Sequence, residues 1–449
     1  MQAHGWKEWS AVGVAAAAVA TAGAAAGYLV AASWTGPTAA PTTAGAPLPA
    51  SIMAQRTVNP IRGVVEKIDR SGHPEKDMVT LALGDPTLFG NFAPPPSANA
   101  VADSFAAASA NGYTHSAGLP AARKAIAETY SYPDQGNTLS PSDVVIASGA
   151  SGAIYLAIQA LCNEGDNILV PEPGFALYGT ASRSCGVEDI KYPLLPDKNW
   201  EIDLDALAAK ITPRTRAIVV NNPSNPCGSV FTRAHMLDIL ALAAEFGLPI
   251  IADEIYMGMV FDGVEALSFA QLPLPTPVLT ISGLAKRYMV PGWRVGWVCV
   301  YDVDARAAPI RDALYSLAQI TLGACTLIQS AIPSLLQETP ESYHAGNNAQ
   351  LEANATLVSA RLNAIPGVTT IAPQGAMYCM CHIDFDAFDD AIQSDMDFVQ
   401  GLLDEQSVFV LPGSSFNAPQ YFRVVFAPPK DKLEVALTRI EEFCATHAK

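Results

Sequence analysis

The segment from Pro277 to Arg294 reads PVLTISGLAKRYMVPGWR. Its apolar first half predicts a strand buried in a sheet, and the small residues at 282–283 predict the turn that ends this strand. Lys286 follows that turn and is therefore expected at the edge of the sheet. A lysine after a strand is usually a solvated surface residue, so its meaning depends on what the neighbouring strands carry.

Similar apolar runs cover residues 143–147, 167–170, 217–220, 248–252 and 294–300, and helices are expected from residue 152 and over residues 236–246. Continuous apolar strands that alternate with helices predict a mostly parallel sheet covered by helices on both faces. A long helical stretch is expected over about 321–350, before strands at 375–380 and 422–426. The predicted fold class is α/β, with a large domain and a smaller α+β domain.

The domain boundaries follow from this change of pattern. Residues 96–335 are predicted to form the large domain and residues 336–449 the small one, which residues 51–95 complete. Residues 1–50 contain an apolar leader and a linker rich in Pro, Ala and Thr. The uncharged run over residues 11–33 is compatible with a signal anchor, a cleaved signal peptide or an incidental helical leader, so membrane association is expected only through it.

Charge and cysteine usage restrict the class of protein. Asp and Glu number 43 against 26 Lys and Arg, a net charge of −17 that disfavours binding to nucleic acid and anionic lipid. An anionic ligand must then be held by a few placed arginines and backbone amides. The eight cysteines are scattered without zinc-site spacing, which predicts buried free thiols, a reducing compartment and no metal centre.

Polar residues follow three of the predicted strands. Besides Lys286, Asp253 and Tyr256 follow the strand over 248–252, and Asn225 follows the strand over 217–220. Ligands of parallel sheets bind at the carboxyl ends of strands, so these side chains are expected around one site. A lysine, an aspartate, a tyrosine and an asparagine are the groups that hold pyridoxal 5'-phosphate as a Schiff base, which makes it the predicted cofactor.

Each of these residues has an expected role. Lys286 would attach the cofactor and then move the α-proton of the substrate, which requires an unprotonated amine. Asp253 would keep the pyridine nitrogen protonated, and Tyr256 and Asn225 would bind the phenolic oxygen of the ring. Two alternatives stay open, because Asp253 could instead be a helix N-cap and Asn225 a turn residue.

The phosphate of this cofactor needs a helix N-terminus, a hydroxyl and a cation. The turn over residues 148–152 supplies backbone amides, with Ala150 and Ser151 at its centre, and Arg294 supplies a guanidinium. Any tight crossing from strand to helix can contain such a glycine-rich turn, so the turn alone does not identify a phosphate site.

Phe175 and Arg423 complete the predicted site. Phe175 follows the strand over 167–170 and would stack on the cofactor ring, although its spacing fits a core aromatic equally well. Arg423 lies inside an apolar strand, where an arginine is rare unless it is paired. It is expected to bind a substrate carboxylate, with a structural salt bridge as the alternative. The substrate side-chain pocket is expected from loops around 87–91 and 414–417.

With these residues in place, the chain resembles the fold-type I pyridoxal-phosphate aminotransferases of class I/II, and within them the group that acts on tyrosine. The similarity runs from about Asn59 to Phe443. The motifs that carry it are Asn59–Arg62, Gly84–Thr87, Asn111–Tyr113, Pro171–Phe175, Asn221–Gly228, Asp253–Tyr256, Gly283–Arg287, Pro291–Arg294 and Gly375–Tyr378.

The resemblance implies roles that spacing does not. Tyr113 would reach the cofactor phosphate of a partner subunit, which implies a homodimer, and Gly84 would contact the substrate carboxylate beside Arg423. The implied reaction is ping-pong amino transfer from an aromatic L-amino acid, tyrosine first, to a 2-oxo acid such as 2-oxoglutarate. Many relatives have a serine where this chain has Gly283, and Ser282 is expected to substitute for it. A second arginine for the distal carboxylate of 2-oxoglutarate is not identified.

Two alternatives of other kinds are retained. A carbon–sulfur β-lyase would keep the fold and the cofactor but break a different bond. A non-catalytic, ligand-sensing module of a regulator would need a DNA-binding domain, and the 50 residues before the body are neither basic nor large enough for one. Lys286, which such a module would not need, is present.

Overall fold

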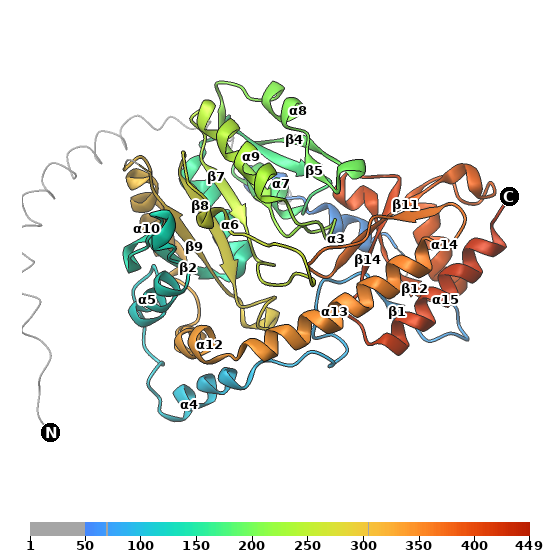
Figure 1. The fold of residues 1–449 in the computed structure, drawn as a ribbon, viewed down its shortest axis with the longest axis horizontal. Helices are drawn as coiled ribbons and strands as arrows, with labels where there is room; N and C mark the ends of the chain where they lie inside the picture. Colours follow the sequence, from blue (N-terminus) through green and yellow to red (C-terminus); the bar gives the residue numbers. More distant parts are fainter. Residues whose placement is uncertain (1–49, 69–70, 304) are drawn as a thin grey trace, which may run out of the picture. The chain divides into compact units, whose positions relative to one another are not determined.

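An eight-stranded mixed sheet organises the protein in a computed structural model that describes residues 50–68, 71–303 and 305–449 (Figure 1). Residues 52–449 form one unit. The predicted leader over residues 11–33 and the linker after it lie outside the described residues. Among the described residues, no helix has both the length and the hydrophobicity that a transbilayer segment requires.

The strands of this sheet follow the order β2-β9-β8-β7-β6-β3-β4-β5. Their bounds are β2 (Val144–Ser148), β3 (Asn167–Glu172), β4 (Glu188–Leu195), β5 (Glu201–Ile202), β6 (Thr215–Asn221), β7 (Ile250–Asp253), β8 (Val278–Gly283) and β9 (Val295–Tyr301). Within it, β5 and β9 run antiparallel to their neighbours and the other six strands run in one direction. The predicted α/β class, with its mostly parallel sheet, is confirmed.

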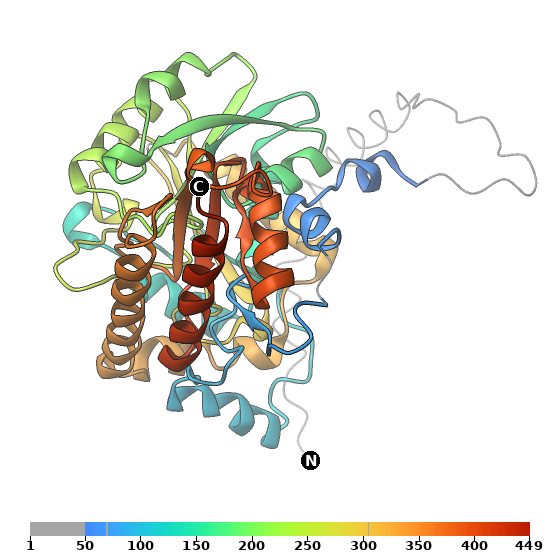
Figure 2. The same ribbon diagram turned by 90° about the vertical axis from the view of Figure 1, so that its right-hand side faces the viewer.

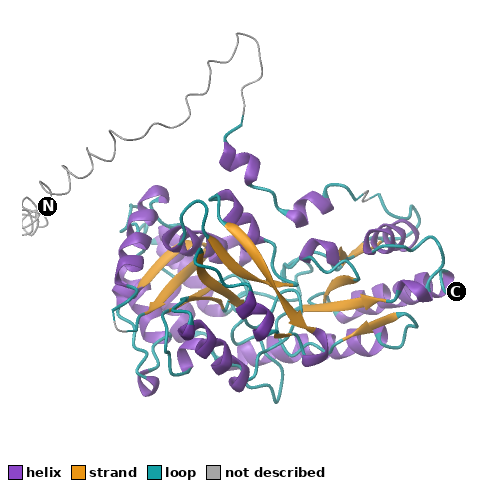
Figure 3. Cartoon of the chain, turned by 90° about the horizontal axis from the view of Figure 1, so that it is seen from above, coloured by secondary structure: helices purple, strands orange, loops and turns teal. Residues whose placement is uncertain are grey.

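Helices cover both faces of the sheet because both faces of each central strand are apolar (Figure 3). In β6, Ala217 and Val219 pack in the cluster that contains α6 (Gly149–Leu161), α7 (Leu177–Ser184) and α10 (Ala308–Thr321). Ile218 and Val220 point to the opposite face and pack against α9 (Arg233–Glu245). Near β2 and β9, that second face is covered by α5 (Pro120–Thr129) and α12 (Ile332–Glu338).

A second sheet is built from C-terminal strands in the order β10-β11-β14-β13. These strands are β10 (Val368–Thr370), β11 (Tyr378–Ile383), β13 (Leu411–Pro412) and β14 (Tyr421–Val425), all antiparallel. Three helices, α13 (Glu341–Leu362), α14 (Asp395–Gln406) and α15 (Lys430–Thr446), lie side by side along it (Figure 2). The division of residues 51–449 into a large and a small domain stays a prediction.

An N-terminal segment joins this C-terminal part. Strand β1 (Val79–Thr80) pairs in parallel with β12 (Val408–Phe409), and Val79 and Leu81 are buried in the same apolar cluster as α14 and α15. The remaining helices are α2 (Ile52–Arg56), α3 (Pro60–Val65), α4 (Ala100–Ala106), α8 (Leu204–Ala209) and α11 (Thr326–Gln329).

The predicted helix over 321–350 is wrong. That stretch is divided among α11, α12 and α13, and α10 already ends at Thr321. Leu322 and Gly323 have φ +57° and +84°, which end the helical path, and Pro340 lacks the N–H that a continuing helix needs. Strands β4 and β5 were not predicted, because β4 mixes exposed and buried positions and lacks a continuous apolar run.

The cysteines are free thiols, and six of them, Cys162, Cys227, Cys299, Cys379, Cys381 and Cys444, are buried. Cys185 is half-buried and Cys325 is exposed. For the six buried residues, the prediction of buried free thiols is therefore confirmed.

Candidate active site

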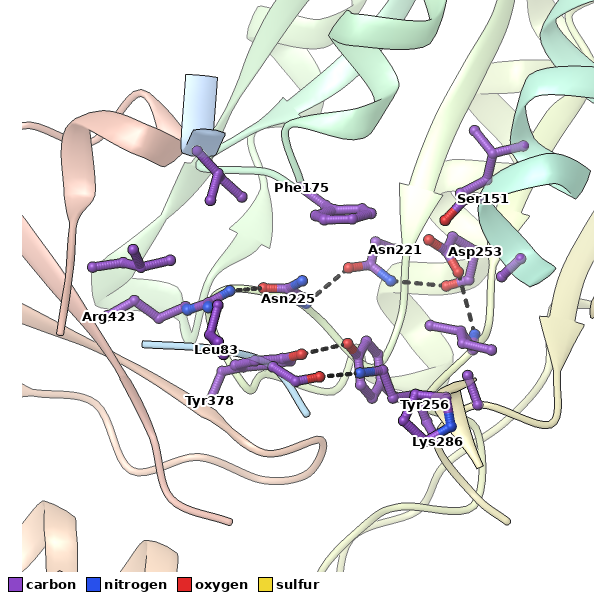
Figure 4. Close-up of a pocket in the computed structure, with 18 of the residues that line it drawn as sticks. Leu83, Ser151, Phe175, Asn221, Asn225, Asp253, Tyr256, Lys286, Tyr378 and Arg423 are labelled. Carbon is purple, nitrogen blue, oxygen red and sulfur yellow. Dashed lines mark hydrogen bonds between the residues drawn. The ribbon is translucent and has the colours of Figure 1, made fainter. Parts of the chain in front are cut away.

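A cavity of about 270 Å³ lies at the carboxyl ends of β6, β7 and β8, which are neighbours in the sheet (Figure 4). Most of the predicted site residues line it, namely Gly84, Ala150, Ser151, Phe175, Asn225, Asp253, Tyr256, Lys286, Arg294 and Arg423. Residues from distant parts of the chain thus meet where a parallel sheet is expected to bind its ligand.

Two predicted site residues do not line this cavity. Ser282 lies within β8, is 8% exposed and pairs with Trp297 of β9. Tyr113 is 94% exposed and borders a separate surface hollow together with residues 321–327. A single chain therefore does not bring these two side chains to the cavity.

Asp253 is a buried carboxylate at the end of β7. It accepts hydrogen bonds from the Tyr178 hydroxyl (2.6 Å) and from the Ile255 amide (3.3 Å). Burial raises the pKa of Asp253 to about 6, and these two hydrogen bonds oppose that rise. Among the ion pairs of the described residues, none involves Asp253. A buried carboxylate without a cationic partner fits a protonated pyridine nitrogen placed against it.

Arg423 is a buried guanidinium that also lacks an ionic partner in the described part of the chain. Its Nη1 donates to Asn225 Oδ1 (2.9 Å) and its Nη2 donates to the carbonyl oxygen of Ala82 (2.6 Å). Its Nε is buried and has no hydrogen-bond partner among the described residues. The described residues therefore provide no salt bridge to Arg423, and the arginine has charge and an N–H group available for a carboxylate.

Asn221 connects two of the strand ends. Its Nδ2 donates to the carbonyl oxygen of Asp253 (2.9 Å), and its Oδ1 accepts from the backbone amide of Asn225 (2.7 Å). Figure 4 shows the resulting series of hydrogen bonds from Arg423 through Asn225 and Asn221 to Asp253. These bonds hold the turn after β6 so that the Asn225 side chain faces Arg423.

Lys286 follows β8 and is half-buried. Its Nζ donates a short hydrogen bond to the carbonyl oxygen of Gly84 and lies 5.8 Å from the centre of the Tyr256 ring. The amine therefore sits between the predicted contact for the substrate carboxylate and the predicted contact for the cofactor ring.

The start of α6 forms a cradle for an anion. Gly149 has φ +71°, a backbone conformation that favours glycine, and a Cβ there would lie 2.5 Å from Nη2 of Arg294 and displace that guanidinium. Ala150 and Ser151 occupy the first turn of this 13-residue helix and line the cavity. Helix amides, a hydroxyl and a guanidinium together suit a phosphate.

Phe175 presents its ring to the cavity (Figure 4) and meets Tyr178 edge to face at 5.8 Å. It is half-buried and also packs against the α6 side of the sheet. The two sequence-based interpretations of this residue, a ring contact and a core contact, are therefore compatible.

Sequence reasoning missed several residues of the site. Tyr178 binds Asp253, and Tyr378 bonds to the Tyr256 hydroxyl. Ile61, Leu83 and Leu411 form an apolar part of the lining, where loops at 87–91 and 414–417 were predicted but do not line the cavity. Asn221, Tyr378 and Ile61 belong to motifs noted above, which could have identified them, but no local pattern marks Leu83 and Leu411.

The sequence and the fold are similar to those of known proteins. A family model described as "Aminotransferase class I and II" matches residues 76–440. Tyrosine aminotransferase of Mus musculus is 43% identical over 399 residues, which cover 88% of this chain and 87% of the relative. The tyrosine aminotransferase of Dictyostelium discoideum is 42% identical over 402 residues, which cover 88% of this chain and 96% of the relative. The crystal structure of tyrosine aminotransferase from Leishmania infantum matches with a TM-score of 0.87 at 36% identity, covering 90% of this chain and 100% of that chain.

Proposed function

The chain belongs to the aminotransferase class I and II family, and we propose that it transfers the amino group of an aromatic L-amino acid to a 2-oxo acid. Tyrosine is the proposed donor and 2-oxoglutarate the proposed acceptor. The observation that carries this proposal is one cavity lined by the Lys286 amine and by two buried charged groups, Asp253 and Arg423, that form no ion pair with any described residue.

The cofactor of this family is pyridoxal 5'-phosphate, and the residues of the cavity fit it. When bound, it supplies an aldehyde that carries the amino group between the two substrates and a ring that accepts electrons from the α-carbon. Asp253 would hold the proton on the pyridine nitrogen. Ser151, Arg294 and the amides at the start of α6 would bind the phosphate, and Phe175 would pack on the ring.

Lys286 has two proposed tasks in turn. Its Nζ would attach the cofactor covalently, and after the substrate amine has displaced it, the same nitrogen would take the α-proton of the substrate. The hydrogen bond to the Gly84 carbonyl keeps Nζ beside the position proposed for the substrate carboxylate.

Arg423 would bind the α-carboxylate that the amino acid and the 2-oxo acid have in common. Asn225 orients its guanidinium through the 2.9 Å bond, and the unpartnered Nε supports a further contact to a ligand. The same arrangement serves both substrates, so the two half-reactions would alternate at one site in a ping-pong order.

The lining favours an aromatic donor. Ile61, Leu83 and Leu411 give the cavity an apolar part of its lining, and Leu411 pairs with Arg423 across two strands. An aromatic ring gains from burial against these side chains. The cations of the described lining are Lys286, Arg294 and Arg423, and each already has a proposed task. None of the three is available for a second carboxylate, so the distal carboxylate of 2-oxoglutarate would meet no cation of the described lining.

We also propose a homodimer with shared sites, in which Tyr113 reaches the partner's phosphate. Its 94% exposure supports a contact beyond its own chain, and the nearby Ile320 (75% exposed) and Leu322 (53% exposed) are apolar groups that gain from being covered. The resemblance also led to the expectation that Ser282 contacts the phosphate. The structure gives that expectation no support, because Ser282 lies within β8.

Product analysis tests the proposed reaction. Incubation of the holoenzyme with L-tyrosine and 2-oxoglutarate should yield the 2-oxo acid of tyrosine and glutamate in equal amounts. A β-lyase would instead release ammonia and a thiol from a sulfur-containing amino acid without needing any 2-oxo acid. The comparisons do not favour this lyase alternative, and thiol release in place of glutamate formation would reverse that preference.

A further inference from the structure

Tyr378 is buried at the start of β11 and lines the cavity. The residue is 1% exposed. Its hydroxyl oxygen lies 2.7 Å from the hydroxyl oxygen of Tyr256, and the two rings meet edge to face at 5.5 Å. Figure 4 shows this pair as a direct bridge between the four-stranded sheet, which carries Tyr378, and the turn after β7, which carries Tyr256.

The direction of this hydrogen bond matters because each hydroxyl has a single proton. If Tyr256 is to donate its proton to the ring oxygen of the cofactor, it must accept from Tyr378 and cannot donate to it. Among the described residues, the Tyr378 hydroxyl forms its hydrogen bond with the Tyr256 hydroxyl. Donation from Tyr378 would also polarise the Tyr256 hydroxyl and strengthen the bond that Tyr256 makes next.

We infer that Tyr378 is a positioning residue whose hydroxyl directs the Tyr256 proton toward the cofactor. This inference rests on the proposed function. The two tyrosines then act as a relay in which Tyr378 donates to Tyr256 and Tyr256 donates to the ring oxygen. The relay stabilises the ionised form of that oxygen more than Tyr256 alone would.

The ring of Tyr378 has a separate contact, at the carboxylate end of the cavity. The guanidinium carbon of Arg423 lies 4.5 Å from the centre of the Tyr378 ring and 4.7 Å from that of Phe416. A Cβ at Gly84 would lie 2.3 Å from the Tyr378 hydroxyl oxygen, so the backbone that accepts from Lys286 passes directly against this tyrosine. The hydroxyl thus serves the cofactor side, and the ring supports Arg423.

These two tasks are separable by substitution. Tyr378→Phe removes the hydroxyl and keeps the ring, so it should lower kcat while leaving the KM for L-tyrosine within about twofold. Tyr378→Leu removes both, so it should also raise that KM by about three- to tenfold, because Arg423 loses one of its two aromatic neighbours. Equal KM increases in both variants would show that the hydroxyl merely holds the fold of the site.

The decisive experiment is a pH titration of the visible absorption band of the bound cofactor in four holoenzymes. They are the wild type, Tyr256→Phe, Tyr378→Phe and the double variant. Weaker stabilisation of the ionised oxygen raises the pH midpoint of the band, and Tyr378→Phe should raise it by about half a pH unit. Tyr256→Phe should raise it further, and the double variant should equal Tyr256→Phe, since the relay acts only through Tyr256.

Tyr192→Phe is the matched control. Tyr192 is also 1% exposed, and its hydroxyl donates a 2.6 Å hydrogen bond to the carbonyl oxygen of Val219, away from the cavity lining. Its loss should lower thermal stability about as much as Tyr378→Phe does and leave the midpoint unchanged.

The outcomes distinguish the two levels of the proposal. A midpoint unchanged in Tyr256→Phe would overturn the proposed contact between Tyr256 and the cofactor. A shift in Tyr256→Phe with none in Tyr378→Phe, or additive shifts in the double variant, would overturn the relay alone.

Discussion

Arg423 Nη1 donates a 2.9 Å hydrogen bond to Oδ1 of Asn225, a residue 198 positions earlier in the chain. Arg423 belongs to β14 of the four-stranded sheet, and Asn225 follows β6 of the eight-stranded sheet. One contact therefore joins the two sheets at the wall of the cavity, and the position of the guanidinium depends on both.

Replacing Arg423 by leucine should raise the KM for L-tyrosine and for 2-oxoglutarate together, because both present the same α-carboxylate. Loss of a charge-assisted hydrogen bond corresponds to about 10- to 100-fold in each constant. Arg423→Lys keeps the charge without the planar fork and should fall between the leucine variant and the wild type. Steady-state kinetics with each substrate varied in turn measure this, and an unchanged KM for either substrate would reject the assignment.

Lys286→Ala should abolish turnover while the protein still binds the cofactor without a covalent bond. Treatment of the wild-type holoenzyme with borohydride should fix the cofactor on the peptide that contains Lys286, as mass spectrometry would show. The next residue is Arg287, whose guanidinium is not a primary amine and cannot take over the task of Lys286. Label on another lysine, or normal turnover in the alanine variant, would contradict the account.

Asp253 gives a pH-dependent prediction for the cofactor-free protein. Its folded-state pKa of about 6 lies above the value of about 3.9 for an unfolded chain. Its contribution to stability is therefore present below about pH 4 and is lost as the pH rises through about 6. At pH 8 the buried charge destabilises the folded state by up to about 3 kcal/mol.

Asp253→Asn removes this charge and keeps an oxygen for the Tyr178 hydroxyl. The cofactor-free variant should therefore unfold at a higher temperature than the wild type at pH 8, with the difference shrinking toward pH 4. Thermal unfolding across this range measures the effect. The holoenzyme of the same variant should lose most of its activity, so a variant with equal stability at every pH and full activity would contradict both proposed properties of Asp253.

If Tyr113 completes the site of the partner subunit, two inactive variants should restore activity to each other in mixed dimers. Tyr113→Ala and Lys286→Ala should each be nearly inactive alone, whereas mixed dimers would contain one site with neither substitution. About a quarter of the wild-type activity per subunit is expected from random mixing, because half of the dimers are mixed and each has one intact site of two. Subunit exchange should first be verified with tagged chains. Mixed dimers without any regained activity would count against a shared site.

Much of the catalytic centre could be predicted because its residues follow the ends of apolar strands. Lys286, Asp253 and Asn225 lie at or just beyond the ends of three strands that are neighbours in the sheet, so local sequence patterns identify them. The burial of Arg423 could also be expected, since its strand neighbours are apolar.

Other features depend on tertiary contacts that no local pattern reports. The bond between Tyr378 and Tyr256 joins residues 122 positions apart, and the apolar wall takes Ile61, Leu83 and Leu411 from separate elements. Strand β4 was not predicted, because its residues alternate irregularly between exposed, half-buried and buried positions. The helix expected over 321–350 is interrupted near Gly323 and at Pro340. A search for helix breakers would have corrected the second error.

The visible absorption spectrum of the full-length holoenzyme, recorded with each substrate added separately, tests the central claim most directly. L-Tyrosine alone should abolish the band of the lysine-bound cofactor, and 2-oxoglutarate added after removal of the tyrosine should restore it. This reversible change requires amino transfer in two half-reactions at one site. A band that L-tyrosine leaves untouched, or that 2-oxoglutarate fails to restore, would contradict the account.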